Sequence, residues 1–346
     1  MRFALFYLAI ALIFGGLVQY SVTGAPPYAV TWLVNVYYDR MPFLVELFVP
    51  DDERAEVTPL SRSDRLVYEA VARELEVHSR PLRFYDFKRV SKLNIPECGL
   101  TDVTLLALCT EIRELALYYN PVEDVSPLSA CIKLRTLNLT DCLVRDIYPV
   151  CALPELEELT LQGCPLSEGL DALDELTPRL MAADFTVPEL REAVALADDM
   201  IASLPAYARE DPRSAAAILF RRVVEGANYG GGAESADQSA SAALRGDQTL
   251  CWGIARALTL VYNRAGIRAA TVTGYLSSSN GGNSEGHAWV LMELGGALYY
   301  ADPTAERERS AQTGNVDLAY FMMDAESMTD IYTWRRTEWE TGLRGE

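Results

Sequence analysis

The chain has 346 residues, which is enough for two domains of ordinary size. Half of the residues are hydrophobic and 23% are charged, a composition that excludes intrinsic disorder. The formal net charge of -19 argues against nucleic acid or an anionic membrane surface as a partner, because both attract basic proteins.

An apolar run at the N-terminus predicts a targeting segment or a membrane anchor. Arg2 precedes the uncharged run Phe3–Val18. This run is longer than the core of a signal peptide, about 7–15 residues, and shorter than the roughly 20 residues that span a bilayer. We therefore expect a signal peptide, cleaved or not, or an anchor in residues 1–25, followed by a juxtamembrane segment in residues 26–59. Arg2 on the amino side favours an extracytoplasmic protein, anchored or secreted. A second span in residues 28–49 would turn the protein toward the cytoplasm, but its three charges disfavour insertion.

The middle of the chain repeats every 22 residues. Leucines mark the period, an apolar residue follows each of them two positions later, and Asn or Cys follows five positions later. Stacked units place identical positions on strands about 4.8 Å apart, so the leucines form an apolar ladder that no single unit would bury alone. A helix that begins at Ser63 is expected to cap this ladder, within a repeat domain of residues 60–180. The leucines are Leu93, Leu115, Leu137 and Leu159, and the Asn/Cys positions are Cys98, Asn120, Cys142 and Cys164.

The pattern L-x-x-L-x-L-x-x-N/C resembles the leucine-rich repeat, in the short form typical of bacterial surface proteins. The resemblance implies an α/β solenoid, and the side chains between the ladder positions would line its concave face. Mixed charges and two tyrosines suit a protein or glycan partner there, with a solvated sheet face as the competing interpretation. The candidate binding residues are Arg113, Glu114, Tyr118, Tyr119, Arg135, Asn138, Asp141, Glu157 and Glu158.

The repeat register accounts for six of the seven cysteines. Ladder cysteines are usually reduced core residues, although adjacent rungs would also bring Cys142 and Cys164 within disulfide reach. Only Cys251 is left without a structural explanation. The other six are Cys98, Cys109, Cys131, Cys142, Cys151 and Cys164.

The repeat pattern ends after Leu173. We expect one helix over Glu189–Leu204 and another after Asp211-Pro212, which has the residue types of a helix N-cap and first turn. A loop rich in Gly, Ser and Ala, Gly230–Ser241, is expected immediately before a helix that begins at Cys251.

Cys251, His287 and Asp302 have the local sequences that a thiol catalytic triad requires. A thiol attacks an amide as the thiolate, which is favoured at a helix N-terminus and beside an imidazolium. His287 lies in an expected strand, Asp302 ends the next one, and Gly295-Gly296 between them predicts a hairpin. On neighbouring strands, Asp302 would accept the imidazole N–H and fix its tautomer.

Around this triad the sequence resembles the bacterial transglutaminase-like fold of the papain-like superfamily, over roughly residues 189–346. The resemblance implies acyl transfer through a thioester, with Cys251 as nucleophile, His287 as general base and acid, and Asp302 as orienting acid. The matching segments are Cys251-Trp252-Gly253, Gly266-Ile267-Arg268, Val272, Gly274-Tyr275, Gly286-His287-Ala288-Trp289, Asp302-Pro303-Thr304 and Tyr320-Phe321-Met322.

The resemblance also bears on the oxyanion contact and on the wall of the pocket. The backbone N–H of Cys251 would supply part of the oxyanion contact, and Gln248 or Tyr229 are side-chain candidates. Many relatives have Gly-Tyr-Ala after the cysteine where this chain has Trp252-Gly253-Ile254, so the wall of the pocket is expected to differ.

Together these patterns predict an α/β solenoid of leucine-rich repeats followed by an α+β transglutaminase-like (papain-like) domain in residues 181–346. We expect a cell-surface cysteine-dependent acyl transferase or hydrolase, of peptidase or amidase type, that acts on protein or peptide amides. The alternative is a non-catalytic surface binding protein or adhesin that uses the repeat array. We predict no cofactor and no metal, since one histidine and one cysteine do not make a zinc site. No residue decides between hydrolysis and crosslinking.

Overall fold

The computed structural model describes residues 51–230, 237–276 and 286–344. The predicted N-terminal anchor and the second apolar stretch lie outside these ranges. Within them, no helix is both long and apolar enough to cross a membrane.

The described residues fall into two compact units. The smaller unit holds residues 51–58 and 75–86, and it is held together by the bridge between Glu56 and Arg83 and by the Arg80–Asp86 ion pair, whose Nη1–Oδ2 distance is 2.7 Å. The larger unit holds residues 59–74 and everything from 87 onward, so the repeats and the second half of the chain belong to one unit.

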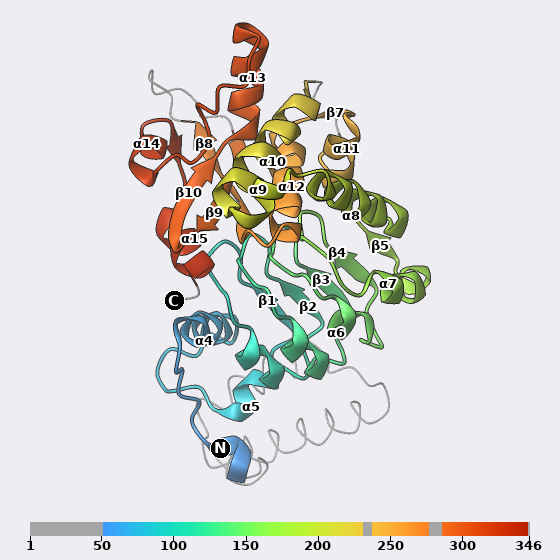
Figure 1. Cartoon of the computed structure of the whole chain (residues 1–346). Helices are drawn as coiled ribbons and strands as arrows, with labels where there is room; N and C mark the ends of the chain where they lie inside the picture. Colours follow the sequence, from blue (N-terminus) through green and yellow to red (C-terminus); the bar gives the residue numbers. More distant parts are fainter. Residues whose placement is uncertain (1–50, 231–236, 277–285, 345–346) are drawn as a thin grey trace, which may run out of the picture. The chain divides into compact units, whose positions relative to one another are not determined.

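Five short parallel strands form the repeat sheet, in chain order (Figure 1). The predicted leucine ladder is confirmed, because the four leucines pair in register across β1 to β4 and are at most 2% exposed. The sheet goes one strand further than the repeat pattern, since β5 pairs with β4 through two exposed alanines that carry no leucine signal. The strands are β1 (Lys92–Asn94), β2 (Glu114–Ala116), β3 (Thr136–Asn138), β4 (Glu158–Thr160) and β5 (Ala182–Ala183).

Short helices connect these strands, and a longer one covers the first of them. Helix α4 begins at Arg62, one residue before the expected start, and the Ser63 hydroxyl accepts hydrogen bonds from the backbone of Thr101 and Asp102 at 3.2 Å. Helix α4 contacts β1, as expected for a cap on the ladder. The helices are η1 (Asp51–Arg54), α4 (Arg62–Glu74), α5 (Phe84–Phe87), η2 (Thr104–Leu108), η3 (Ser126–Ala130), α6 (Tyr148–Cys151), α7 (Leu170–Leu176) and η4 (Thr177–Arg179).

The Asn/Cys positions point inward, as the pattern predicts. Asn120 is fully buried; its amide donates to the carbonyls of Ile95 and Leu117 at 2.7 and 2.8 Å and its oxygen accepts from two further backbone N–H groups. The thiols of Cys142 and Cys164 donate to repeat carbonyls at 3.4 and 3.1 Å. All seven cysteines are free, so these two form no disulfide.

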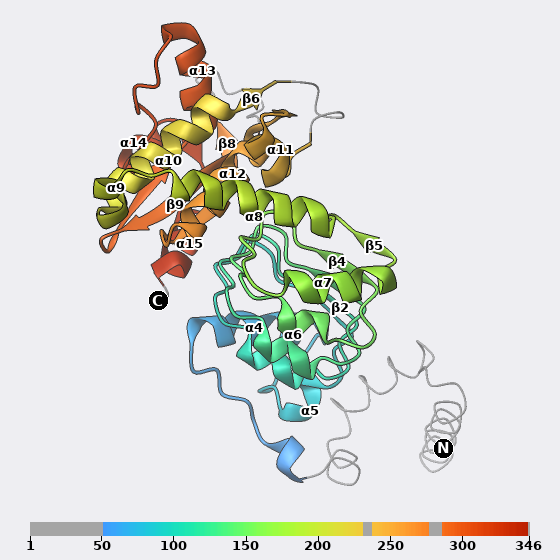
Figure 2. The same ribbon diagram turned by 45° about the vertical axis from the view of Figure 1, so that its right-hand side comes forward.

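In the second half of the chain, helices pack on a four-stranded antiparallel sheet with the order β10-β9-β8-β11. The helix α12 is buried on nearly every side because it contacts this sheet as well as α8, α10, α11 and α13. Figure 2 shows α8 beside the last repeats, and it contacts α7 of the array together with α11 and α12. The strands are β6 (Asn228–Tyr229), β7 (Gln248–Thr249), β8 (Ala269–Leu276), β9 (Gly286–Leu294), β10 (Ala297–Ala301) and β11 (Tyr332–Thr333).

The predicted helices of this half are present with small shifts. The first, α8, begins and ends two residues earlier than expected, and the Asp211 carboxylate caps α10 by accepting from the backbone of Arg213 and Ser214. The expectation that a loop directly precedes the cysteine helix is wrong, because α11 and β7 intervene. The helices are α8 (Val187–Ala202), α9 (Ala206–Glu210), α10 (Pro212–Gly226), α11 (Ala240–Arg245), α12 (Cys251–Arg264), α13 (Pro303–Thr313), α14 (Ala325–Thr329) and α15 (Arg336–Arg344).

Candidate active site

Cys251 is the first residue of α12. The preceding residue, Leu250, is extended and supplies no side-chain cap, so the first-turn N–H groups of the helix are not occupied by its N-cap residue. The side chain is 8% exposed. The sulfur therefore sits at the N-terminal end of a buried helix, where the aligned backbone N–H groups present partial positive charge.

His287 lies in β9, opposite Gly274 of β8. Its Nε2 is 2.8 Å from Oδ2 of Asp302, and the Cys251 side chain is close enough to the ring to help raise the pKa of the imidazole. Because Nε2 is engaged by the carboxylate, Nδ1 is the nitrogen left for the sulfur. The structure thus brings the three predicted triad residues together.

Asp302 is fully buried, and hydrogen bonds to both of its carboxylate oxygens hold the side chain in one orientation. The Gly295-Gly296 turn, with φ of +63° and +79°, closes the β9–β10 hairpin, and Asp302 directly follows β10. Its Oδ1 accepts from the backbone N–H groups of Thr304 and Ala305 at 3.0 and 2.9 Å, so it also caps α13. One carboxylate therefore anchors a helix and orients the imidazole.

Tyr332 is a site residue that the sequence analysis did not find. Its hydroxyl donates to Oδ2 of Asp302, and its ring stacks on that of His287 with centroids 5.7 Å apart and planes inclined by 5°. Trp289 packs against both rings. The signal available in the sequence was weak, because β11 has only two residues and lies 30 positions after the acid.

The pKa of His287 is set by opposing effects. Burial lowers it, but the hydrogen bonds and charges of Asp302 and Cys251 outweigh burial and raise the pKa to about 10. The imidazole is then cationic at neutral pH. An imidazolium beside the sulfur favours the thiolate–imidazolium pair that acyl transfer requires.

The two oxyanion candidates lie on adjacent strands that lead into α12. Tyr229 of β6 pairs with Thr249 of β7, and Gln248 stands three residues before the cysteine. Tyr229 is 37% exposed and Gln248 is also exposed. This places both near the start of the helix.

The predicted concave face divides into two parts. Asp141 is not on an open surface: it is 1% exposed and forms an ion pair with Arg256 of α12. Tyr119 is half-buried and its ring lies 5.8 Å from that of Trp252. These two residues face the second half of the chain because they stand beyond the ends of β2 and β3, not within the strands.

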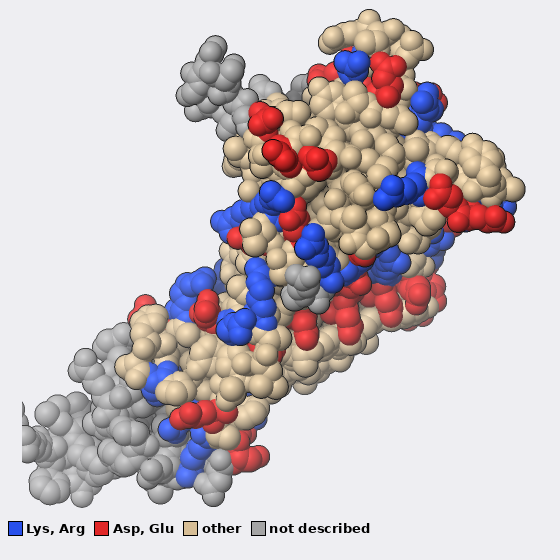
Figure 3. Space-filling model, turned by 60° about the vertical axis from the view of Figure 1, so that its left-hand side comes forward, with Lys and Arg blue, Asp and Glu red and all other residues tan. Residues whose placement is uncertain are grey.

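Of the other candidates, Glu114, Asn138 and Glu158 lie within the strands, and Arg113, Tyr118, Arg135 and Glu157 lie within two residues of a strand end. Arg135 is exposed and lies 3.5 Å from carboxylate oxygens of both Glu155 and Glu157. Figure 3 shows one face of the molecule on which basic side chains lie beside acidic ones. Among the other predicted residues, Glu114 and Glu158 are exposed, while Arg113, Tyr118, Asn138 and Glu157 are half-buried.

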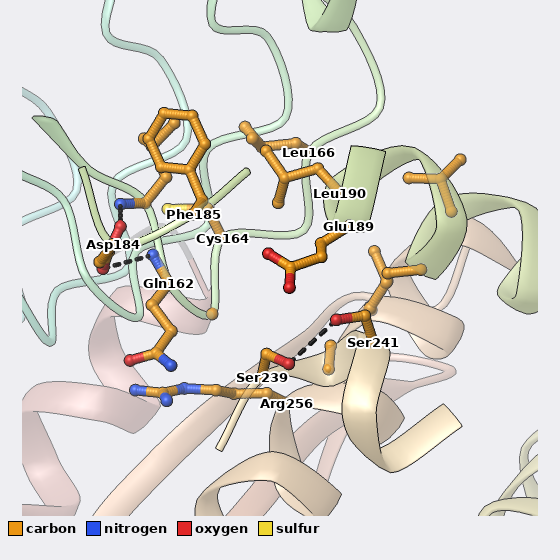
Figure 4. A pocket seen from close by; sticks show the side chains of 16 residues that line it. Gln162, Cys164, Leu166, Asp184, Phe185, Glu189, Leu190, Ser239, Ser241 and Arg256 are labelled. Carbon is orange, nitrogen blue, oxygen red and sulfur yellow. Dashed lines mark hydrogen bonds between the residues drawn. The ribbon is translucent and has the colours of Figure 1, made fainter. Parts of the chain in front are cut away.

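The array and the second half of the chain share two hollows. The first, with a cavity volume of ≈ 60 Å³, is lined by the last repeat turns, α8, the start of α11 and Arg256 (Figure 4). The second, of ≈ 370 Å³, is lined by Tyr119, Gln162, Gln238, Trp252 and Arg256. The second is the one that reaches the cysteine segment, because Trp252 directly follows Cys251.

Residues 202–303 match the family model of the transglutaminase-like superfamily, so the chain contains a transglutaminase-like domain. This match supports a cysteine-dependent enzyme in general and includes all three triad residues. A search of the curated proteins finds no match.

The solved structures to which the chain is similar are of two kinds. An internalin of Listeria monocytogenes is 23% identical over 35% of this chain and 35% of its own, with a TM-score of 0.33. An internalin C2 of the same organism is 22% identical over 37% of this chain and 68% of its own, with a TM-score of 0.30. A protein of Cytophaga hutchinsonii, described as a suspected cysteine protease, is 16% identical over 35% of this chain and 43% of its own, with a TM-score of 0.26.

Proposed function

We propose that the protein is a cysteine-dependent acyl transferase or hydrolase that cleaves protein or peptide amides through a thioester on Cys251. The observation that carries the proposal is the chain of side-chain contacts from Cys251 to His287 to Asp302, in which the acid is held by four hydrogen bonds. A structural histidine would not need a neighbouring thiol at a helix N-terminus.

The first half-reaction uses each triad residue once. The Cys251 thiolate forms a bond to the amide carbonyl carbon, and the N–H of the first helical residue is suited to bind the developing oxyanion. The C–N bond then breaks as the His287 imidazolium gives its proton to the leaving amine. Asp302 keeps the ring in one tautomer throughout.

The second half-reaction returns the enzyme to its starting state. Neutral His287 takes a proton from water or from a second amine, which attacks the thioester carbon and expels Cys251 as the thiolate. Water gives hydrolysis, and an amine gives crosslinking.

The array and the N-terminal segment extend the proposal. A solenoid of leucine-rich repeats would precede the papain-like catalytic domain and hold a protein substrate or attach the enzyme to a protein or glycan partner. The apolar residues 1–25 favour an extracytoplasmic enzyme at the cell surface.

A labelling experiment tests the catalytic part. Iodoacetamide should alkylate Cys251 faster than the six repeat cysteines, of which Cys98 is half-buried and the other five are buried, and His287→Ala should slow this alkylation at pH 7. Incubation of wild type and Cys251→Ala with a glutamine peptide and an amine should then give conjugate or free acid only with wild type. A Cys251 that reacts no faster than the repeat thiols would favour the binding protein or adhesin instead.

A further inference from the structure

The hollow of ≈ 370 Å³ beside the cysteine segment has walls from both halves of the chain. Tyr119 and Gln162 come from repeat turns, Gln238 precedes α11, and Trp252 and Arg256 belong to the first turns of α12. In Figure 4 the Gln162 side chain points toward that of Arg256. A molecule bound here would touch the array and the catalytic helix together.

Close packing fixes the Gln238 wall against α12. The Thr249 hydroxyl donates to the Asp237 carbonyl at 2.6 Å, and Nη1 of Arg256 donates to the Gln238 carbonyl at 3.1 Å. A Cβ on Gly253 would lie 2.1 Å from the Thr249 hydroxyl oxygen and 3.3 Å from the Gln238 backbone, so this glycine permits the approach. The departure from relatives at Trp252-Gly253 therefore has a physical use in this chain.

The charge and the aromatic surface of the hollow are already engaged. Arg256 is neutralised by Asp141, with Nε 2.8 Å from Oδ1. The Trp252 ring packs against Tyr119, and the Arg256 guanidinium lies 5.4 Å from its centroid. A charged group would enter without a free counter-ion, and a sugar would meet a Trp252 ring that already contacts Tyr119 and Arg256.

One acceptor in this wall is unused. Oε1 of Gln238 is buried and has no hydrogen-bond partner among the described residues. An unpaired buried oxygen costs about 1–3 kcal/mol, and a neutral N–H or O–H donor from a bound molecule would remove this cost once the Gln238 side chain turns toward the hollow.

We propose that this hollow is a specificity subsite for an uncharged hydrogen-bonding side chain, of the carboxamide type, on the residue that flanks the amide attacked by Cys251. The proposal rests on the proposed function, because it places this side chain on the substrate of the Cys251 thiolate. Gln238 and Gln162 bind the carboxamide, and the Arg256–Asp141 pair holds the wall.

Peptidyl electrophiles that alkylate thiols test the subsite. Three probes carry asparagine, aspartate or leucine at the flanking position, and mass spectrometry measures the alkylation rate of Cys251. We expect the asparagine probe to react at least about tenfold faster than the other two, since a site built for a hydrogen-bonding group rejects analogues that lack it. Gln238→Met and Gln162→Met should lower the asparagine rate about tenfold toward the leucine rate. Gln312→Met, on the exposed end of α13, is the matched control and should keep the preference.

Iodoacetamide separates the two proposals, because it has no side chain to recognise. If it labels Cys251 in a His287-dependent way while all three peptidyl probes react equally, the subsite is refuted and the proposed function stands. If it fails to label Cys251 selectively, both are refuted. A glycosylated-asparagine probe that reacts faster than plain asparagine would also overturn the subsite, in favour of a sugar site.

Discussion

Arg256 of the cysteine helix and Asp141 of the repeat array form a buried ion pair, with side chains 5% and 0% exposed. The two residues are 115 positions apart, and the guanidinium meets both carboxylate oxygens. Bidentate geometry of this kind fixes direction as well as distance. The pair therefore links the array to α12 within the larger unit.

Removing one partner should destabilise the protein strongly. Asp141→Asn leaves the buried Arg256 without its counter-charge, and Arg256→Met leaves the buried Asp141 without its counter-charge. Each variant should lower the free energy of unfolding by about 3–5 kcal/mol. Urea denaturation measures this change. Arg264→Met, on the same helix, removes an ion pair with the exposed Asp198 and should cost at most about 1 kcal/mol. Equal losses for the two arginines would show that the buried pair has no special role.

Asp302→Asn should disturb the orientation of the His287 imidazole more than the stability of α13, the helix that Asp302 caps. An asparagine can still cap α13, but it presents an N–H where the imidazole needs an acceptor, so Cys251 alkylation at pH 7 should slow on the order of 10²–10⁴-fold. Asp324→Asn, at the N-cap of α14, changes a cap without an imidazole and should leave the rate unchanged. If both variants lose reactivity to the same extent, the acid acts only as a cap.

Tyr332→Phe keeps the stacked ring and removes the donor to Asp302. We expect a loss of about 1.5–3 kcal/mol in the free energy of unfolding, because one hydrogen bond to a buried carboxylate is lost. Alkylation of Cys251 should also slow by severalfold, since the carboxylate is less firmly held. Tyr275→Phe, at an exposed tyrosine of the neighbouring strand β8, is the control for both measurements. A Tyr332→Phe protein indistinguishable from the control would remove Tyr332 from the site.

Stability should depend on pH through His287. Its pKa in the folded protein is raised to about 10, above the ordinary value of 6.5, so protonation favours the folded state. This contribution is fully present below pH 6.5 and is lost as the pH rises through 10. The difference in free energy of unfolding between wild type and His287→Gln should therefore shrink from pH 6 to pH 10. A difference that grew over this range would contradict the thiolate–imidazolium pair.

Gly274→Ala should disturb the strand that faces His287. An added Cβ would lie 2.4 Å from the Thr333 carbonyl and 2.6 Å from the Trp289 ring, and overpacking of this kind costs about 1–3 kcal/mol. Gly286→Ala, beside His287 in β9, meets no atom within 4 Å and is the control for a thermal-denaturation series. Equal melting temperatures for the two variants would mean that β8 and β11 move apart to accommodate the added methyl group without loss of stability.

The sequence predicts the parts of this protein whose signals are local. The leucine period sets the register of β1 to β4, and the Gly295-Gly296 turn places His287 beside Asp302. Contacts between distant segments leave no such signal. Tyr332 reaches the site from a two-residue strand, and β5 continues the sheet through alanines, so neither has a periodic pattern.

Asp141 is a residue whose burial the repeat pattern does not predict. Its place in the repeat predicts an open concave face, and only the folded chain reveals that Arg256 covers it. Asp141 is buried because an arginine 115 positions away pairs with it. The sequence has many arginines, and no local pattern identifies Arg256 as the partner.

The hydrogen bond from Tyr332 to Asp302 has a consequence for the order in which the enzyme is completed. The chain is synthesised from its N-terminus, so the repeats and the nucleophile emerge well before residue 332. Until that tyrosine arrives, the acid lacks one of its donors and the imidazole lacks one of its stacking partners. A nascent or C-terminally trimmed chain that lacks this tyrosine would thus carry Cys251 in an unfinished site, which delays full reactivity until residue 332 is in place.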